Sequence, residues 1–128
     1  MLNSSNKKIA SGKRAPRKWA KPRAVRRCPF VASVEVTELK SGTRLSARTS
    51  EVGLGGCYVD ALNPFANGTI VKLRIVRDQG AFEAKAKVVY SDLSFGMGLS
   101  FTEIAPEQRV ILENWLAEIV LELRPVAQ

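Results

Sequence analysis

Between positions 30 and 101 the sequence alternates polar and apolar residues in six short runs, and residues typical of turns separate one run from the next. In the first run, "FVASVEVTEL", Val34 and Val36 alternate with Glu35 and Thr37. A period of two is typical of a strand with one buried face and one face in water. Six consecutive strands without a helix between them favour an antiparallel sheet, and we predict a small β-barrel.

The expected strands are joined by short connections rich in glycine, asparagine and aspartate. These residues favour turns because they tolerate backbone angles that other residues avoid, or because they bond to their own backbone. The glycines of the last run, "FGMGLSF", suit a bend in a barrel or a close approach of another backbone. The six predicted strands cover residues 30–39, 43–50, 57–62, 69–77, 81–90 and 95–101.

After Pro106 the apolar residues recur at spacings of three and four, which predicts an amphipathic helix. Pro106 fits the first turn of a helix, where its missing N–H would have no partner, and Pro125 ends the helix. We expect the helix to cap or flank the barrel, with Trp115 and Phe101 in the core. The apolar positions of the predicted helix are Val110, Ile111, Leu112, Trp115, Leu116, Ile119, Val120 and Leu123.

The positive charge of the chain is concentrated at its N-terminus. Residues 1–30 contain ten lysines and arginines and no acidic residue, whereas the remainder contains ten basic and twelve acidic residues. The net charge of +8 therefore comes from the tail, and the rest of the chain carries −2. Because residues 1–22 are basic and poor in apolar side chains, we expect a disordered tail there. We expect a barrel domain over residues 23–124 and a short C-terminal tail over residues 125–128.

The composition excludes several functions. The chain has no histidine, which removes the commonest metal ligand and a frequent catalytic base. Its two cysteines, Cys28 and Cys57, are too few for a disulfide framework or a metal site. No apolar run is long enough to span a membrane, and the basic N-terminus lacks the apolar segment of a secretory signal. We therefore expect a cytoplasmic protein with free thiols that is not an enzyme and holds no metal or cofactor.

Three arginines, Arg23, Arg26 and Arg27, stand directly before the first predicted strand. Guanidinium groups present planar pairs of donors that match phosphate oxygens and the edge of guanine, and they stack on bases. The cluster is compatible with an anion-binding site between tail and domain. It is also compatible with the last charges of a solvated tail.

The stretch "SEVGLGGCYVD" contains a second candidate feature. Gly53, Gly55 and Gly56 permit positive φ angles and let a ligand approach the backbone closely. Glu51 offers a carboxylate that can accept two N–H donors, such as those on the edge of guanine. The same stretch is compatible with a plain turn or bulge between two strands, with Glu51 in solvent.

Taken together, the two features resemble the motifs of the PilZ domain. In that family R-x-x-x-R near the N-terminus precedes [D/N]-x-S-x-x-G between the second and third strands. Here Arg23-Ala-Val-Arg-Arg27 matches the first motif, and Glu51-Val-Gly53-Leu-Gly-Gly56 aligns with the second. Glutamate replaces the aspartate or asparagine of the pattern, and Gly53 replaces its serine. The stretches "VVY" and "GMGLSFTEI" are also similar to later parts of the family, so the resemblance covers residues 22–120.

The resemblance implies a receptor for cyclic di-GMP, a bacterial second messenger, built on a six-stranded β-barrel. It assigns the phosphate and guanine contacts to Arg23 and Arg27, with Arg26 as a supporting cation. Glu51 would accept hydrogen bonds from guanine, and Gly56 would keep the backbone clear. The serine hydroxyl is missing at Gly53, whose N–H would take over part of its role. Binding would order the arginine segment across the barrel and present a new surface to a protein partner.

Two other functions stay open at this point. Some PilZ domains act as protein-interaction adaptors without a nucleotide, and the departures at Glu51 and Gly53 favour that alternative. A third alternative is a nucleic acid bound by the basic tail, with steep salt dependence expected. Trp19, in the tail, is compatible with stacking on a base, with packing on the barrel, or with no role.

Overall fold

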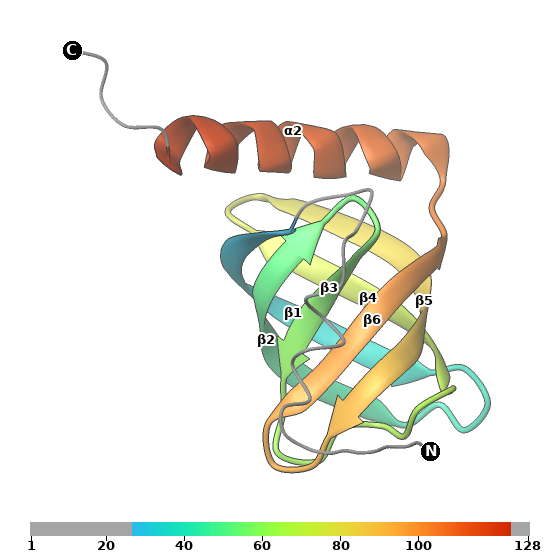
Figure 1. Ribbon diagram of the computed structural model, residues 1–128. Coiled ribbons are helices and arrows are strands. Elements are labelled where there is room, and N and C mark those ends of the chain that lie inside the picture. Colours follow the sequence, from blue (N-terminus) through green and yellow to red (C-terminus); the bar gives the residue numbers. More distant parts are fainter. Residues whose placement is uncertain (1–26, 124–128) are drawn as a thin grey trace, which may run out of the picture.

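The computed structural model describes residues 27–123, in which six antiparallel strands close into a barrel and one helix crosses its end (Figure 1). The order around the barrel is β1-β2-β3-β6-β5-β4. The fold class predicted from the sequence is therefore confirmed. The predicted tails at 1–22 and 125–128, together with Arg23 and Arg26, lie outside the described residues. The elements are β1 (Arg27–Glu38), β2 (Arg44–Gly53), β3 (Gly56–Asp60), β4 (Ile70–Arg77), β5 (Gly80–Asp92), β6 (Gly96–Glu103) and α2 (Pro106–Leu123).

The alternation of the sequence places every second side chain of the strands inside the barrel. In β1, Val34 and Val36 are buried while Glu35 between them is exposed. This burial of apolar surface is the main favourable contribution to the stability of the fold. The core consists of Phe30, Ala32, Val34, Val36, Val52, Cys57, Val59, Val71, Leu73, Ile75, Phe82, Ala84, Ala86, Val88, Met97, Leu99, Leu112 and Trp115.

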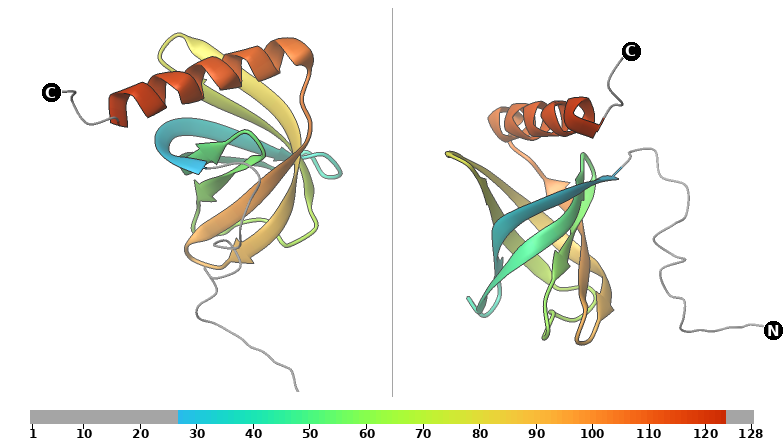
Figure 2. Two further views of the ribbon diagram at one scale, coloured as in Figure 1. Left: turned by 45° about the horizontal axis from the view of Figure 1, so that its top comes forward. Right: turned by 90° about the vertical axis from the view of Figure 1, so that its left-hand side faces the viewer.

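The helix α2 lies across the end of the barrel (Figures 1 and 2). Its Trp115 is buried against two rings of the barrel, with ring centroids 5.7 Å from Phe30 and 6.5 Å from Phe82. Phe101 meets Phe82 edge-on at 5.4 Å and is half-buried against the core. The core positions predicted for Trp115 and Phe101 are thus confirmed, the second as a partly buried one.

The apolar stripe of α2 is wider than the surface that the barrel covers. Leu112 and Trp115 are buried, but Val110 and Val120 near the two ends of the helix remain 53% and 49% exposed. Ile111, Leu116 and Ile119 pack against the core and are partly buried. The remaining apolar side chains of the stripe are available for other contacts.

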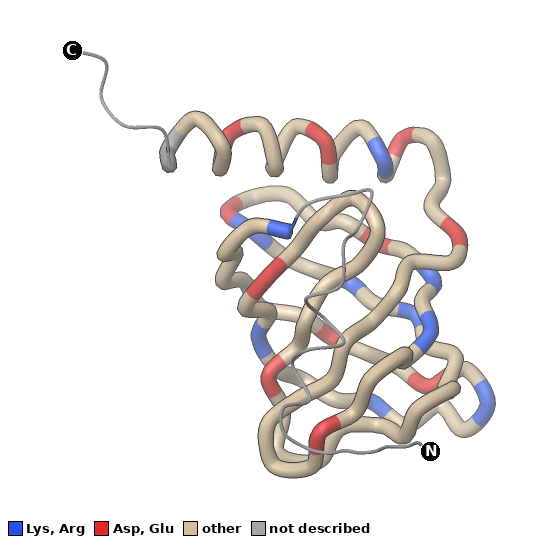
Figure 3. Tube along the Cα trace, viewed as in Figure 1, with Lys and Arg blue, Asp and Glu red and all other residues tan. Residues whose placement is uncertain are grey.

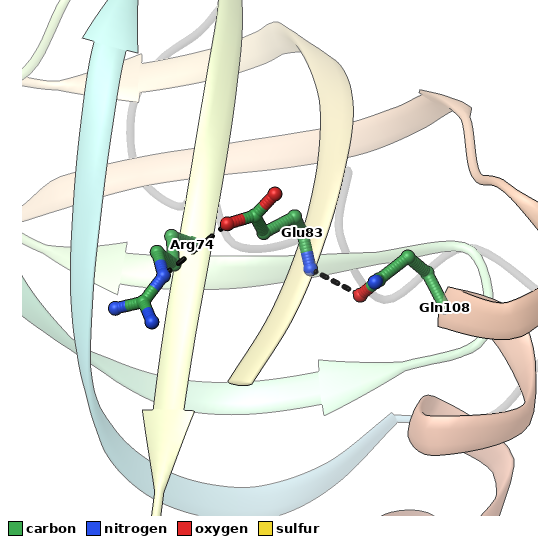
Figure 4. A network of polar contacts seen from close by, with 3 residues as sticks. All are labelled: Arg74, Glu83 and Gln108. Atoms are coloured by element: carbon green, nitrogen blue, oxygen red, sulfur yellow. Dashed lines mark hydrogen bonds and ion pairs between the residues drawn. The ribbon is translucent and has the colours of Figure 1, made fainter. Parts of the chain in front are cut away.

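Polar contacts hold α2 at two places on the barrel. At its N-terminal end the side-chain carbonyl of Gln108 accepts a hydrogen bond of 2.8 Å from the backbone N–H of Glu83, whose carboxylate also accepts one of 3.2 Å from Arg74 (Figure 4). Further along, the guanidinium of Arg77 lies 2.7 Å from the carboxylate of Glu118. These contacts fix the helix position relative to β4 and β5.

A break in the strand register separates the two ends of β1. The pairing of β1 with β2 shifts between Pro29 and Ala32, and that of β2 with β3 shifts between Thr49 and Glu51. The buried hydroxyl of Thr49 donates to the carbonyl of Phe30 at 2.6 Å and accepts from the N–H of Ala32 at 3.1 Å. It thereby provides hydrogen-bond partners for two backbone groups at the register shift.

Charges of both signs are interspersed over the barrel, as Figure 3 shows. Over residues 27–123 there is neither a cluster of side chains suited to a metal ion nor a helix long and apolar enough to cross a membrane.

Candidate functional site

The predicted site residues that the structure describes come together where β1 begins and β2 turns into β3. In the ladder Arg27 stands opposite Gly53, and Pro29 stands opposite Glu51. The connection to β3 consists of Leu54 and Gly55, after which Gly56 starts the next strand. The pairing of β1 with β2 therefore brings the last arginine of the first motif beside the second motif. Arg23 and Arg26 belong to the part of the chain that the structure does not describe.

Gly56 is tightly enclosed by its neighbours. It is buried, and a Cβ at this position would collide with the backbone carbonyl oxygen of Leu99 and lie 2.7 Å from Nη2 of Arg27. The absence of a side chain thus lets β6 and the guanidinium of Arg27 approach the backbone. The described glycines with positive φ are Gly42 and Gly68, so the turn does not require that property of Gly53, Gly55 or Gly56. The close approach at Gly56 is the feature that requires glycine.

The guanidinium of Arg27 is held against the barrel wall. The side chain is half-buried, and its Nη2 lies 3.5 Å from the carbonyl oxygen of Leu99. Its charge acts on the neighbouring Cys57, where burial raises the pKa of the thiol to about 12 and Arg27 opposes that shift. A guanidinium that is already held in place can bind an anion with little loss of side-chain entropy.

Cys57 itself is an inert member of the core. The side chain is fully buried, and its raised pKa keeps the thiol protonated at neutral pH. The expectation that Cys57 is a small buried apolar residue is confirmed. Cys28 is half-buried, and both thiols are free.

Glu51 projects from the outer surface beside an aromatic residue that the sequence analysis did not single out. Glu51 is exposed and stands opposite Tyr58 in the β2–β3 ladder. A Cβ at Gly96 would lie 2.8 Å from Cε2 and 3.0 Å from the hydroxyl of Tyr58, so the ring covers the backbone of that glycine. The glycine-rich stretch "FGMGLSF" was the available signal, because a close approach was expected there.

The phenol of Tyr58 is neutral at physiological pH. Burial raises its pKa to about 12, and the negative charges of Asp92, Asp60 and Glu51, together with the neighbouring Tyr90, act in the same direction. These residues come from β2, β3 and β5. Tyr58 lies between the buried Cys57 and Val59 in β3, so its ring is on the outer face of the barrel. The surface beside Glu51 is therefore acidic and aromatic, whereas the adjoining surface at Arg27 is basic.

The geometry combines a cation, a carboxylate and a half-buried aromatic ring on neighbouring strands. A cation next to a carboxylate complements a ligand that has an anionic part and a part that donates hydrogen bonds. These groups lie on neighbouring strands of the barrel wall.

The chain belongs to the PilZ domain family, because the family model of the PilZ domain matches residues 17–118. The match begins ten residues before β1, so it includes the arginine cluster. No curated protein sequence matches the chain. The family assignment agrees with the resemblance found in the two motifs.

Solved structures share the fold. The inhibitor of motility MotI/DgrA of Bacillus subtilis is 20% identical with a TM-score of 0.68, over 82% of this chain and 54% of that chain. The chain therefore spans about half of that protein. The PilZ domain of YcgR from Escherichia coli with c-di-GMP is 15% identical with a TM-score of 0.65, over 81% and 95% of the two chains. The PilZ domain of CeSA from a cellulose-synthesizing bacterium is 18% identical with a TM-score of 0.59, over 74% and 98%.

Proposed function

We propose that this chain is a receptor for cyclic di-GMP and that the ligand binds where β1 begins and β2 turns into β3. The observation that supports this most directly is the convergence of Arg27 on Gly53 and Gly56, since these residues belong to two separate sequence motifs. Membership of the PilZ family and the similarity to the PilZ domain of YcgR with c-di-GMP support the same ligand.

The arginines bind the anionic part of the ligand. Arg27 supplies a guanidinium already placed beside the β2–β3 turn, and Arg23 and Arg26 precede it in the chain. The ten basic residues of positions 1–30 attract a dianionic ligand toward this end of the barrel. When the arginines close over the phosphates, the surface offered to a protein partner changes.

The guanine part of the ligand is bound by the neighbouring strands. Glu51 accepts hydrogen bonds from the N–H groups of a guanine edge, and the ring of Tyr58 beside it provides aromatic surface. Gly53 donates its backbone N–H in place of the serine hydroxyl of the family motif. Gly56 acts indirectly, because its missing side chain leaves room for the guanidinium of Arg27.

The departures from the family motif weaken this site without removing it. A neutral hydrogen bond contributes about 0.5–1.5 kcal/mol, so the missing serine hydroxyl lowers the affinity by up to about tenfold. Glu51 keeps the negative charge of an aspartate and places it one methylene further out. The charge-assisted contacts of the arginines are about twice as strong as neutral ones and are retained.

Calorimetric titration of the full chain with cyclic di-GMP tests the proposal. Arg27→Ala removes a hydrogen-bonded charge worth about 1.5–3 kcal/mol, which corresponds to a loss of affinity of about 10- to 100-fold. Arg27→Lys keeps the charge and loses the planar fork, so an intermediate affinity is expected. Arg44→Ala is the matched control, since Arg44 is an exposed arginine at the other end of β2.

Two results would contradict the proposal. Absence of heat with the unsubstituted chain excludes the receptor function. Equal affinities of the Arg27→Ala and Arg44→Ala variants exclude the site.

An adaptor function without nucleotide is the second candidate, and one feature of the barrel favours it. Leu62, Leu93 and Phe95 are 68–72% exposed in the loops at the end of the barrel away from α2. The two loops are joined by hydrogen bonds of 2.9 Å from the N–H of Ser94 to Leu62 and 3.0 Å from that of Ala61 to Phe95. An exposed apolar cluster on a fixed pair of loops suits a protein partner.

A further inference from the structure

An apolar groove lies between the β2–β3 turn and the C-terminal half of α2. Its volume is about 510 Å³, and its lining consists of Leu54, Glu113, Leu116, Ala117, Val120 and Leu121. Val120 and Leu121 are 49% and 62% exposed, so the described residues cover this part of the helix only in part. An uncovered apolar groove on a small domain indicates a contact with another segment or molecule.

The groove lies beside the point where the chain enters the barrel. Arg27 stands opposite Gly53, and Gly53 directly precedes Leu54, which lines the groove. Figures 1 and 2 show the start of β1 and the β2–β3 turn together on the side of the barrel that faces α2. The 26 residues that precede β1 therefore join the described structure next to the groove.

Trp19 is the residue of that segment whose side chain best matches the groove. It is the only aromatic residue before β1, whereas Val126 is the only large apolar residue after α2. Arg27 is eight positions further along the chain. At about 3.3 Å per residue these eight steps span up to roughly 26 Å. The family match includes this position, because it begins at residue 17.

The charges around Trp19 also complement the groove. Glu113 is the only charged residue in the lining. Lys18 and Lys21 flank Trp19, and residues 1–30 contain no acidic side chain. A tryptophan between lysines can bury its ring in an apolar groove while the ammonium groups stay in water near the carboxylate.

We propose that Trp19 of the same chain occupies the groove between the β2–β3 turn and α2. Residues 20–26 then run from the groove to β1, which keeps Arg23 and Arg26 close to the β2–β3 turn. In that respect the inference rests on the proposed function: a docked Trp19 preorganises the arginines, so occupancy of the groove strengthens the binding of cyclic di-GMP.

Quenching of tryptophan fluorescence by acrylamide, measured on the full chain without ligand, tests the occupancy. The signal of Trp19 is the difference between each protein and its Trp19→Phe counterpart, since Trp115 is buried and contributes a shielded background. Val120→Asp places a charge in the groove. Val110→Asp is the matched control, because Val110 is a valine of the same helix with similar exposure that does not line the groove.

We expect the quenching of Trp19 to rise severalfold in the Val120→Asp variant and to stay unchanged in the Val110→Asp variant. Trypsin cleavage after the lysines and arginines before β1 is expected to accelerate in the Val120→Asp variant and not in the Val110→Asp variant. Far-ultraviolet circular dichroism establishes that both variants are folded, as expected for substitutions at exposed positions.

Three results would overturn the inference. Trp19 equally quenched in all proteins shows that the groove is not its site. Protection that disappears on dilution assigns the groove to a second copy of the chain. Equal affinities of the two aspartate variants for cyclic di-GMP would show that occupancy of the groove does not strengthen binding of the dinucleotide. Failure of the unsubstituted chain to bind the dinucleotide would contradict the proposed function and would leave the quenching result valid.

Discussion

The β4–β5 hairpin and the corner formed by β1, β2 and β3 are built in different ways. β4 and β5 pair without a break from Ile70 to Arg77, and opposite charges such as Arg74 and Glu83 face each other across the ladder. The corner has two register shifts, the buried polar side chain of Thr49 and the crowded Gly56. The regular hairpin follows from alternation alone, whereas the corner depends on single residues. The candidate site lies in the corner.

The largest effect is expected at Gly56, because there the corner admits no side chain. Gly56→Ala places a methyl group against the Leu99 carbonyl and the Arg27 guanidinium, and overpacking of this kind costs about 1–3 kcal/mol or more. Gly55→Ala is the matched control, since a Cβ there meets no atom within 4 Å and neither glycine has a positive φ. Urea denaturation measures the difference. Equal stability of the two variants would mean that the corner accommodates a methyl group at residue 56 as easily as the turn accommodates one at residue 55.

The hydroxyl of Thr49 is expected to have the next largest effect. Thr49→Val keeps the shape of the side chain but leaves the carbonyl of Phe30 and the N–H of Ala32 without this partner in a buried place. An unsatisfied buried group costs about 1–3 kcal/mol, which urea denaturation resolves. Thr102→Val, at an exposed position of β6, is expected to change the stability little. If Thr49→Val is as stable as Thr102→Val, the register shift does not depend on this hydroxyl.

The same contrast explains how far the sequence predicts this molecule. The period of two located all six strands, and the spacing of three and four located the helix, because the pattern of polar and apolar residues reflects which face is buried. It placed the start of β1 at Phe30, three residues late, because "RCP" carries no alternation and is a strand only through its pairing with residues 51–53. The two motifs identified the corner as a candidate site. Tyr58 was missed because the predicted second strand ended at residue 50, whereas β2 continues to Gly53 and pairs Glu51 with Tyr58.

Alkaline pH is expected to affect the corner more than the hairpin, through Cys57. Burial raises the pKa of this thiol from 9.0 to about 12, so the folded state holds the proton more tightly than the unfolded state. The contribution to stability is complete below about pH 9 and is lost as the pH rises toward the folded pKa, with a loss of roughly 1 kcal/mol near pH 10. Tyr58 acts in the same direction.

Denaturation as a function of pH checks this expectation. In a Cys57→Ala variant the decrease of stability between about pH 9 and pH 10 should be smaller than in the unsubstituted chain, whatever the variant's absolute stability. Identical slopes would show that the thiol does not contribute to the pH dependence of this corner.

The smallest effect is expected from restoring the family's serine, and it connects the irregular corner with its proposed ligand. Gly53→Ser adds a hydroxyl at the position opposite Arg27, and one neutral hydrogen bond should raise the affinity for cyclic di-GMP by up to about tenfold. Gly55→Ser, two residues away in the turn, is the control and should leave the affinity unchanged. Tighter binding in both variants would point to a general effect on the turn. Weaker binding of Gly53→Ser at unchanged stability would mean that this chain binds the guanine without a side chain at residue 53. Its second motif would then contact the ligand differently from the serine-containing motif of the family.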